Sequence, residues 1–277
     1  MAQPIVIDAN GARIPALGLG TFRSEGEVCV RAVSEAIRVG YRHIDTARMY
    51  GNEREVGEGL RASGVPRDEV FVTTKVWFED IADGDLQRSA EASLRRLGLD
   101  AVDLLLIHWP NRAVPLESSI KGLCDARRRG LARHIGVSNH PAALLDRAVA
   151  LATEPLVANQ CEYHPTLDQS KVIAACRKHG MAFTSYTPLG KGRDTEDAVV
   201  TEIAKRHGRA PSQIVLRWHV QQPGVAAIPK SSDPGRIAEN FGIWDFSLSE
   251  DEMSRISALA RPGGRVVNPA FAPEWDR

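Results

Sequence analysis

Short apolar segments alternate with amphipathic segments along most of this chain. The apolar segments have the length of β-strands, and joins rich in glycine, proline or polar residues separate them. This alternation is typical of a parallel sheet whose strands are linked by crossover helices. The segments that we expect to form strands are residues 16–19, 42–46, 70–76, 102–107, 132–137, 156–160, 182–186 and 225–229.

The amphipathic segments between the strands repeat with the period of an α-helix. One of them places apolar residues at i, i+3, i+4, i+7 and i+8, which puts them on one helix face. These residues are Cys29, Ala32, Val33, Ala36 and Ile37. Eight units of one strand and one helix each close into a (β/α)8 TIM barrel, for which about 250 residues are enough.

Two segments lie outside the repeating pattern. The sequence of residues 4–16 predicts an N-terminal β-hairpin that turns at Asn10 and Gly11. The C-terminal tail from Pro262 has little periodicity, and we expect it to pack over the active-site rim of the barrel. No linker rich in proline, glycine or serine divides the chain, so residues 1–277 are expected to form a single barrel domain.

Composition narrows the possible partners. The 35 basic and 35 acidic residues give a formal charge of +0, which argues against a nucleic acid or an anionic membrane surface. The four cysteines lie far apart without a CxxC pair, so we expect neither a disulfide framework nor a metal site, and a reducing, cytoplasmic setting fits. No stretch approaches the roughly 18 apolar residues that span a bilayer, and no signal peptide is evident.

Three neighbouring strands end in residues that carry chemistry, at the edge where such barrels place their active sites. Asp45 closes the second strand, and His108 ends a buried run in the fourth. Side-chain alternation in the third strand points Lys75 into the barrel near its top. A buried lysine is costly unless it is paired, and Asp45 supplies a carboxylate at the matching height. Singly, the three could also be a turn residue, a solvent-facing lysine and a core histidine.

Tyr50 follows Asp45 by five positions and completes this group. A phenol has an ordinary pKa of about 10, too high for ready proton donation at neutral pH. We expect the Lys75 cation to lower the pKa of Tyr50, while Asp45 keeps the lysine charged and aimed. Tyr50 would then be a general acid; the alternative is that it packs at the start of the next helix.

The segment IPKSSDPGRIAEN, residues 228–240, predicts an anion site after the eighth strand. Ser232 or Asp233 can cap a helix there, and the free N–H groups of its first turn lie beside Lys230, Ser231 and Arg236. A 2'-phosphate would suit this site, and the alternative is a capped helix with surface charges. The segment GLGTFR lacks the third glycine of the dinucleotide fingerprint, so a Rossmann site is a poor interpretation.

Other residues at strand ends could line a pocket. Ser138 and Asn139 after the fifth strand, and Gln160 after the sixth, could hydrogen-bond a carboxamide. Aromatic residues that follow strand ends would give a pocket apolar walls, or would merely pack at the rim. These are Phe22, Trp77 and Trp109.

Seven motifs resemble those of the aldo-keto reductase superfamily, in that family's order, from about Gly18 to Glu252. They are GYRHIDTARMYGNEREVG, VFVTTKVW, LLLIHWP, IGVSNH, NQCEYHP, SYTPLG and IPKSSDPGRIAEN. The resemblance implies a (β/α)8 barrel that binds NADPH without a Rossmann domain and reduces carbonyls to alcohols. It places the catalytic tetrad on Asp45, Tyr50, Lys75 and His108, with the tyrosine protonating the carbonyl oxygen and the histidine orienting the substrate.

The resemblance also implies the cofactor contacts. Lys230, Ser231, Ser232 and Arg236 would hold the 2'-phosphate, Glu239 and Asn240 the adenine, and Tyr186 would stack on the nicotinamide. The backbone near Gly20, Thr21, Thr187 and Leu189 would border the pyrophosphate and ribose, and Asp45, Ser138, Asn139 and Gln160 complete the expected cofactor site. The expected substrate contacts are Phe22, Tyr50, Trp77, His108 and Trp109.

The loops after the fourth and seventh strands are short, as in bacterial members that reduce small dicarbonyls and keto-sugars, such as 2,5-diketogluconate reductase. Arg48 and Met49 depart from the small residues common at these positions. The expected partner is therefore a small carbonyl substrate, and the family implies a monomer. The alternative function is a redox-silent NADPH-binding regulatory subunit, a kind of protein that the superfamily also contains.

Overall fold

The chain folds into a closed parallel barrel, described for residues 3–276 by a computed structural model. Its strands pair in the order β10-β9-β8-β7-β6-β5-β4-β3, and each neighbouring pair is parallel. Bridges between Leu17 and Ala227 and between Gly20 and Lys230 join the two edges. The strands are β3 (Leu19–Gly20), β4 (His43–Asp45), β5 (Phe71–Val76), β6 (Val102–Ile107), β7 (Ala132–Ser138), β8 (Leu156–Glu162), β9 (Ala182–Tyr186) and β10 (Val225–Ala227). The predicted (β/α)8 barrel is confirmed.

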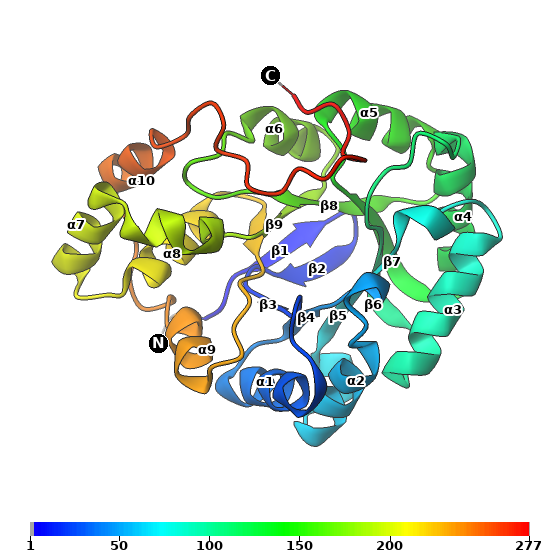
Figure 1. Cartoon of the computed structure of the whole chain (residues 1–277), viewed down its shortest axis with the longest axis horizontal. Helices are drawn as coiled ribbons and strands as arrows, with labels where there is room; N and C mark the ends of the chain where they lie inside the picture. The colour runs from blue at the N-terminus through cyan, green and yellow to red at the C-terminus, as the bar shows by residue number, and fades with distance from the viewer. Residues whose placement is uncertain (1–2, 277) are drawn as a thin grey trace.

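Helices surround the barrel (Figure 1). They are α1 (Gly26–Val39), α2 (Glu53–Ala62), α3 (Asp85–Leu97), α4 (Leu116–Arg128), α5 (Ala142–Leu151), α6 (Ser170–Lys178), α7 (Ala198–His207), α8 (Pro211–Gln221), α9 (Pro234–Phe241) and α10 (Glu250–Ser257), with short 3-10 turns η1 (Arg48–Tyr50), η2 (Arg67–Glu69), η3 (Phe78–Asp80) and η4 (Gly190–Glu196). The apolar face predicted for α1 is buried throughout. Within residues 3–276, no helix combines the length and apolar character needed to cross a membrane.

The closing seam of the barrel explains why two predicted strands end differently from expectation. Residues 16–18 still pair with Ala227, through the bonds Gly18 N–H to Ala227 O at 2.9 Å and Ala227 N–H to Ala16 O at 2.8 Å. The last ladder ends at Ala227, and Pro229 has no N–H with which to extend it. Gly20 lies where the edges approach closely, because a Cβ there would be 2.8 Å from the carbonyl oxygen of Ile228.

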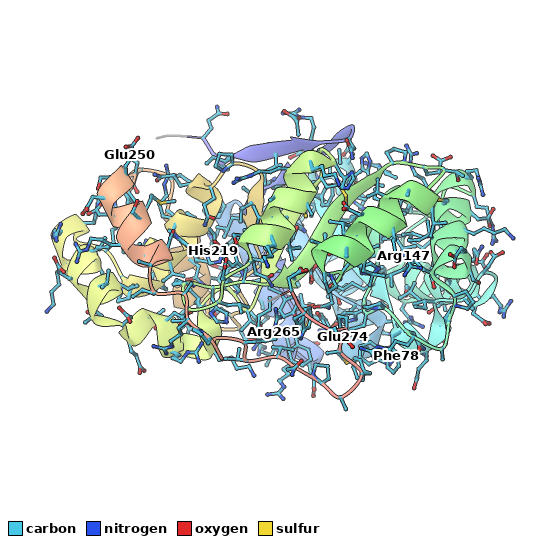
Figure 2. All side chains as sticks on the ribbon, turned by 90° about the horizontal axis from the view of Figure 1, so that it is seen from above. Phe78, Arg147, His219, Glu250, Arg265 and Glu274 are labelled. Atoms are coloured by element: carbon cyan, nitrogen blue, oxygen red, sulfur yellow. The ribbon has the colours of Figure 1, made fainter. Side chains whose placement is uncertain are left out.

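The two terminal segments cover opposite ends of the barrel (Figure 2). The predicted hairpin is present as antiparallel β1 (Val6–Ala9) and β2 (Ala12–Pro15), and its turn residues Asn10 and Gly11 have φ values of 46° and 87°. Such positive φ values are those of a type I′ turn. The C-terminal tail crosses the other end, where the strands finish.

Candidate active site

The parallel register of β4, β5 and β6 brings three ionisable side chains to one rim of the barrel. Asp45 pairs with Thr73, and Lys75 two residues later pairs with Leu106, so Lys75 rises to the height of the β6 end, where His108 follows. The side chains of Lys75 and Asp45 are 0% and 1% exposed. The ion pair is therefore removed from bulk water.

Lys75 is the centre of the site. Its Nζ donates to Asp45 Oδ1 at 2.5 Å, to the Thr46 carbonyl at 2.8 Å and to the Tyr50 hydroxyl at 3.3 Å. The second oxygen of Asp45 accepts from Gln160 Nε2 at 2.8 Å. A buried ion pair is tolerated when additional hydrogen bonds satisfy both partners, as they do here.

The loop after β4 holds Tyr50 against this pair. Asn52 anchors the loop, since it accepts from Thr46 Oγ1 at 2.8 Å and donates to the carbonyls of Thr21 and Ser24 at 2.8 and 2.9 Å. These bonds cross from β4 to the segment after β3. The short turn η1 then points the Tyr50 ring over the barrel mouth, with Lys75 Nζ 4.9 Å from the ring centroid.

The environment of Tyr50 corrects one expectation. Burial raises the pKa of Tyr50, and the charge of Lys75 opposes this effect without reversing it. Burial also lowers the pKa of Lys75, but the carboxylate of Asp45 outweighs that effect, so the pKa of Lys75 is raised overall. The neighbouring lysine can be read from the sequence, but the desolvation of the phenol depends on the folded structure. In this site Tyr50 is a protonated phenol beside a firmly charged ammonium.

His108 lies on the other side of the Tyr50 ring. The two ring centroids are 5.7 Å apart and nearly perpendicular, and the Trp77 ring packs edge-on against His108 at 5.2 Å. Burial and the nearby charge of Lys75 hold the pKa of His108 well below its ordinary value, so the imidazole is neutral at neutral pH. Its Nδ1 is buried without a hydrogen-bond partner within the described part of the chain.

A cavity of about 500 Å³ opens onto Tyr50 and His108 and extends toward the start of α9. Lys230 and Arg236 lie at that far end, and neither side chain has a hydrogen-bond or ion-pair partner among residues 3–276. The residues expected from sequence that line this cavity are Gly20, Thr21, Phe22, Asp45, Tyr50, His108, Trp109, Asn139, Gln160, Tyr186, Thr187, Leu189, Lys230 and Arg236. The cavity thus joins the tetrad to the expected anion site.

Several expected residues lie outside the cavity lining. Trp77 packs behind His108 and on Phe271 instead of facing the cavity. Ser138 is buried and donates to the Gln160 carbonyl at 2.6 Å, so its hydroxyl is already used. The other expected residues that do not line the cavity lie in or just before α9, and they are Ser231, Ser232, Glu239 and Asn240.

The start of α9 resolves the choice between two capping residues. Asp233 is the cap, because its Oδ1 accepts the N–H of Arg236 at 2.8 Å. Ser232 Oγ instead lies 3.3 Å from Ser24 Oγ, across the barrel seam. Glu239 accepts from the Ser212 hydroxyl at 2.7 Å, so its carboxylate faces the start of α8.

A hydrogen-bonded group fixes the middle of the cavity. The Tyr186 hydroxyl donates to Asn139 Oδ1 at 2.8 Å, and Asn139 Nδ2 donates to the His108 carbonyl at 2.9 Å. Asn139 and Thr187 have φ values of 60° and 53°, conformations in which the chain turns sharply out of β7 and β9. These turns place the Tyr186 ring on the cavity wall.

Several residues of the cavity wall were not among those expected from the sequence. They are Met49, Pro188, Lys191, Gly192, Ile228, Pro229 and Val267. Lys191 could have been predicted from the sequence, because it is a lysine between two glycines that follow a strand end. Its Nζ donates to the Val266 carbonyl at 3.1 Å. Val267 has no such signal in the sequence, because long-range contacts bring it to the rim: the N–H groups of Val266 and Val267 donate to Glu162 at 2.6 and 3.0 Å.

The described residues contain no cluster of three or more histidine, cysteine or acidic side chains arranged to hold a metal ion. The donor set of the cavity instead fits a long phosphorylated cofactor. It offers an apolar and aromatic middle, a glycine wall at Gly20 and two unpaired cations at one end. NADPH has this combination of aromatic ring and terminal phosphate.

Known proteins of similar sequence and fold extend these observations. Residues 16–261 match the Aldo/keto reductase family. The chain is 44% identical to the 9,11-endoperoxide prostaglandin H2 reductase of Trypanosoma cruzi, over 90% of this chain and 89% of that protein. It is 40% identical to the methylglyoxal reductase DkgB of Escherichia coli O157:H7, over 95% of this chain and 99% of that one.

Two solved structures show the likeness in three dimensions. A crystal structure described as "a putative 2,5-diketo-D-gluconic acid reductase B" superposes with a TM-score of 0.97 at 46% identity, covering 99% of this chain and 98% of that one. The Bombyx mori aldo-keto reductase, solved in complex with NADP, has a TM-score of 0.89 at 36% identity, covering 97% and 96%. With this agreement over nearly its whole length, the chain belongs to the aldo/keto reductase family.

Proposed function

We propose that this protein reduces small aldehydes, dicarbonyls or keto-sugars to alcohols with NADPH, and that Tyr50 is its proton donor. The class of reaction is that of the family, which makes the protein an NADPH-dependent oxidoreductase. The observation that carries the assignment of Tyr50 is its place at the cavity mouth with its hydroxyl 3.3 Å from Lys75 Nζ.

When bound, NADPH supplies the hydride that the carbonyl carbon accepts. As the C=O π bond breaks, negative charge develops on the carbonyl oxygen, and the Tyr50 hydroxyl gives its proton to that oxygen. The burial that raises the pKa of Tyr50 keeps this proton in place at neutral pH. The Lys75 ammonium then stabilises the phenolate that remains, and Asp45 holds the ammonium in line.

His108 is suited to orient the substrate. Its neutral ring can hydrogen-bond a carbonyl oxygen without competing with Tyr50 as an acid, since its lowered pKa keeps it uncharged. The edge of Trp77 restricts the rotation of the imidazole. Trp77 therefore acts in this proposal by positioning His108.

For the cofactor, we assign the 2'-phosphate to Lys230 and Arg236, which line the far end of the cavity. Ser231 and Ser232, which follow Lys230 in the chain, would add their hydroxyls to this phosphate site, and Glu239 and Asn240 would contact the adenine. Near the tetrad, Asn139, Gln160 and Tyr186 line the cavity. In this proposal Asn139 and Gln160 would contact the carboxamide, and Tyr186 would stack on the nicotinamide ring. Tyr186 is held for this purpose by its bond to Asn139.

The walls of the cavity near the tetrad favour a small substrate. Phe22, Met49 and Trp109 are apolar, and Phe22 packs on Tyr50 with ring centroids 5.1 Å apart. The names of the similar proteins, methylglyoxal reductase and 2,5-diketo-D-gluconic acid reductase, point to the same size of carbonyl compound. Arg48 does not attract the substrate in this proposal, because it pairs with Asp80 at 3.3 Å.

The complete tetrad disfavours a redox-silent regulatory subunit, which would have no need for a buried lysine beside the phenol. We also propose that the protein acts as a monomer in the cytoplasm. The cavity is built from one chain, so no second copy is required to complete it. The four cysteines are free and buried, as suits a reducing compartment.

Replacement of Tyr50 by phenylalanine tests the function. We expect the rate of NADPH oxidation with methylglyoxal, followed by absorbance, to fall by about 10²–10⁴-fold, while NADPH binding measured by fluorescence persists. The matched control is Tyr163→Phe, which removes another buried hydroxyl, bonded to Gln222 at 3.0 Å, away from the cavity. Turnover of Tyr50→Phe close to that of the control would refute the assignment.

A further inference from the structure

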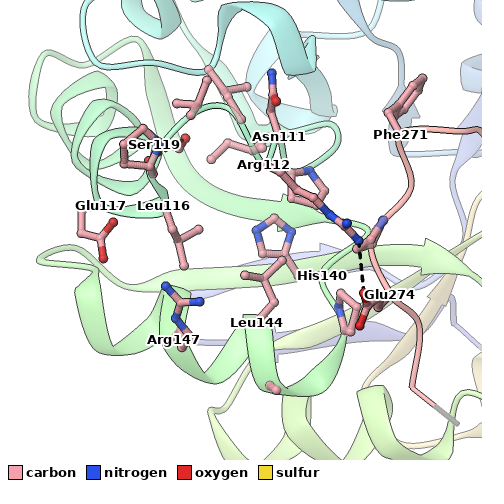
Figure 3. A pocket seen from close by; sticks show the side chains of 18 of the residues that line it. Asn111, Arg112, Leu116, Glu117, Ser119, His140, Leu144, Arg147, Phe271 and Glu274 are labelled. Carbon is pink, nitrogen blue, oxygen red and sulfur yellow. Dashed lines mark hydrogen bonds and ion pairs between the residues drawn. The ribbon is translucent and has the colours of Figure 1, made fainter.

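A second cavity, of about 620 Å³, lies between the first turns of α4 and α5 and the C-terminal tail (Figure 3). It shares no lining residue with the cavity of the tetrad. Apolar side chains, among them Ile107, Leu116 and Leu144, form much of its wall. The tail passes over it, with Phe271 contributing to the lining.

The wall contains a buried hydrogen-bond acceptor that nothing satisfies. His140 is 0% exposed, and its Nδ1 lies 2.9 Å from the Ser138 carbonyl, which can only accept. The proton of the neutral ring is therefore on Nδ1, which leaves Nε2 as an acceptor, and Nε2 has no partner among the described residues. Burial lowers the pKa of His140 to about 4, so the ring stays neutral at neutral pH. An unpaired buried acceptor favours a ligand that brings a donor.

The rim of the cavity carries two arginines, and one of them can receive an anion. The Arg147 side chain, on α5, has no ion pair or hydrogen bond within residues 3–276. Arg112 lies on the tail side of the cavity, where it pairs with Glu274 at 3.7 Å. Arg147 is therefore the cation that a ligand carboxylate would meet.

The acidic residues of the rim do not close the site to an anion. Asp276 is engaged, since its Oδ2 accepts the N–H of Ala142 at the start of α5 at 2.9 Å. This contact shows a carboxylate seated at that helix start, as the helix dipole favours. Glu117 lies on the α4 side of the rim, and no ion pair joins it to Arg147 among the described residues.

We propose that this cavity is a second ligand site, for a small carboxylate that has an apolar body and a hydroxyl group. The carboxylate binds Arg147 at the rim, the apolar body contacts Leu116 and Leu144, and the hydroxyl donates to His140 Nε2. No residue of the tetrad takes part, so the ligand binds together with NADPH. Trp109 lines the tetrad cavity and Phe271 lines this second cavity, and the centroids of their rings are 5.5 Å apart.

Titration calorimetry on the full chain saturated with NADPH tests this site. The probe is 4-hydroxyphenylacetate, compared with phenylacetate, which lacks the hydroxyl, and with 4-hydroxyphenylacetamide, which lacks the charge. We expect the first to bind and each of the others to bind about tenfold more weakly, since one charge-assisted or buried hydrogen bond is lost.

Variants locate the binding. Arg147→Ala is expected to weaken the probe about tenfold. The matched control Arg31→Ala, an exposed helix arginine of α1, should have no effect. Leu144→Trp fills the cavity and should abolish binding, with thermal unfolding measured to show that the variant folds.

Three results would overturn the proposal. They are the absence of binding at millimolar probe, equal binding of the three compounds, and unchanged binding in Arg147→Ala. Competition between the probe and the carbonyl substrate would likewise place the probe in the tetrad cavity and overturn it. The three binding measurements do not depend on the reductase activity, so the failure of the proposed function would leave them intact.

Discussion

Replacement of Lys75 by methionine removes the charge that lies between Asp45 and Tyr50 while keeping an unbranched side chain of similar length. The change deletes three hydrogen bonds of Nζ, to Asp45 Oδ1 at 2.5 Å, to the Thr46 carbonyl at 2.8 Å and to the Tyr50 hydroxyl at 3.3 Å. Asp45, 1% exposed, keeps only the bond from Gln160. The variant therefore has a buried carboxylate without a countercharge.

This variant should lose both stability and activity, for separate reasons. Breaking a buried ion pair by removing one partner costs about 3–5 kcal/mol of unfolding free energy. Activity should fall by about 10²–10⁴-fold, because burial raises the pKa of Tyr50 and the opposing charge of Lys75 is gone. The free energy would be measured by urea unfolding, and the activity by NADPH oxidation with methylglyoxal.

The double variant Lys75→Met with Asp45→Asn separates the two effects. The asparagine carries no charge, and its amide oxygen can still accept from Gln160, so most of the lost stability should return. Activity should stay as low as in the single variant, since the phenolate still has no cation beside it. The reasoning would be refuted by turnover of Lys75→Met within a few-fold of the natural chain, or by a double variant that stays as unstable as the single one.

Three other changes probe the rest of the site. Arg236→Ala should weaken NADPH by more than tenfold and NADH little, measured by fluorescence titration; equal losses would mean that the arginine does not read the 2'-phosphate. The pKa of His108 is held well below its ordinary value, so kcat/KM for reduction should be flat between about pH 6 and 8. It should fall only at lower pH, where the imidazole gains a proton. An inflection at about pH 6.5 that His108→Gln removes would contradict this expectation. Glu162→Gln should weaken the hydrogen bonds that the carboxylate accepts from Val266 and Val267, and so loosen the C-terminal tail. Trypsin should then cleave after Arg265 faster, as measured by mass spectrometry. An unchanged cleavage rate would mean that other contacts hold the tail in place.

The alternation of side chains determined much of this protein from the sequence alone. It set which face of β5 carries Lys75, and the end of each apolar run placed Asp45 and His108 at one rim. These properties are local, because a strand alternates its faces and a parallel sheet gathers the ends of its strands on one edge. Local residue preferences likewise predicted the turn at Asn10 and Gly11 and the start of the helix beside Arg236.

Only the folded barrel determined how deeply each side chain of the site is buried and which residues pack against it. The pKa of Tyr50 is raised and not lowered, because desolvation by the surrounding structure outweighs one nearby charge. Trp77 backs His108, and Val267 reaches the rim, through contacts between segments far apart in the chain. Burial and long-range packing depend on every element at once, so a local pattern carries no signal for them.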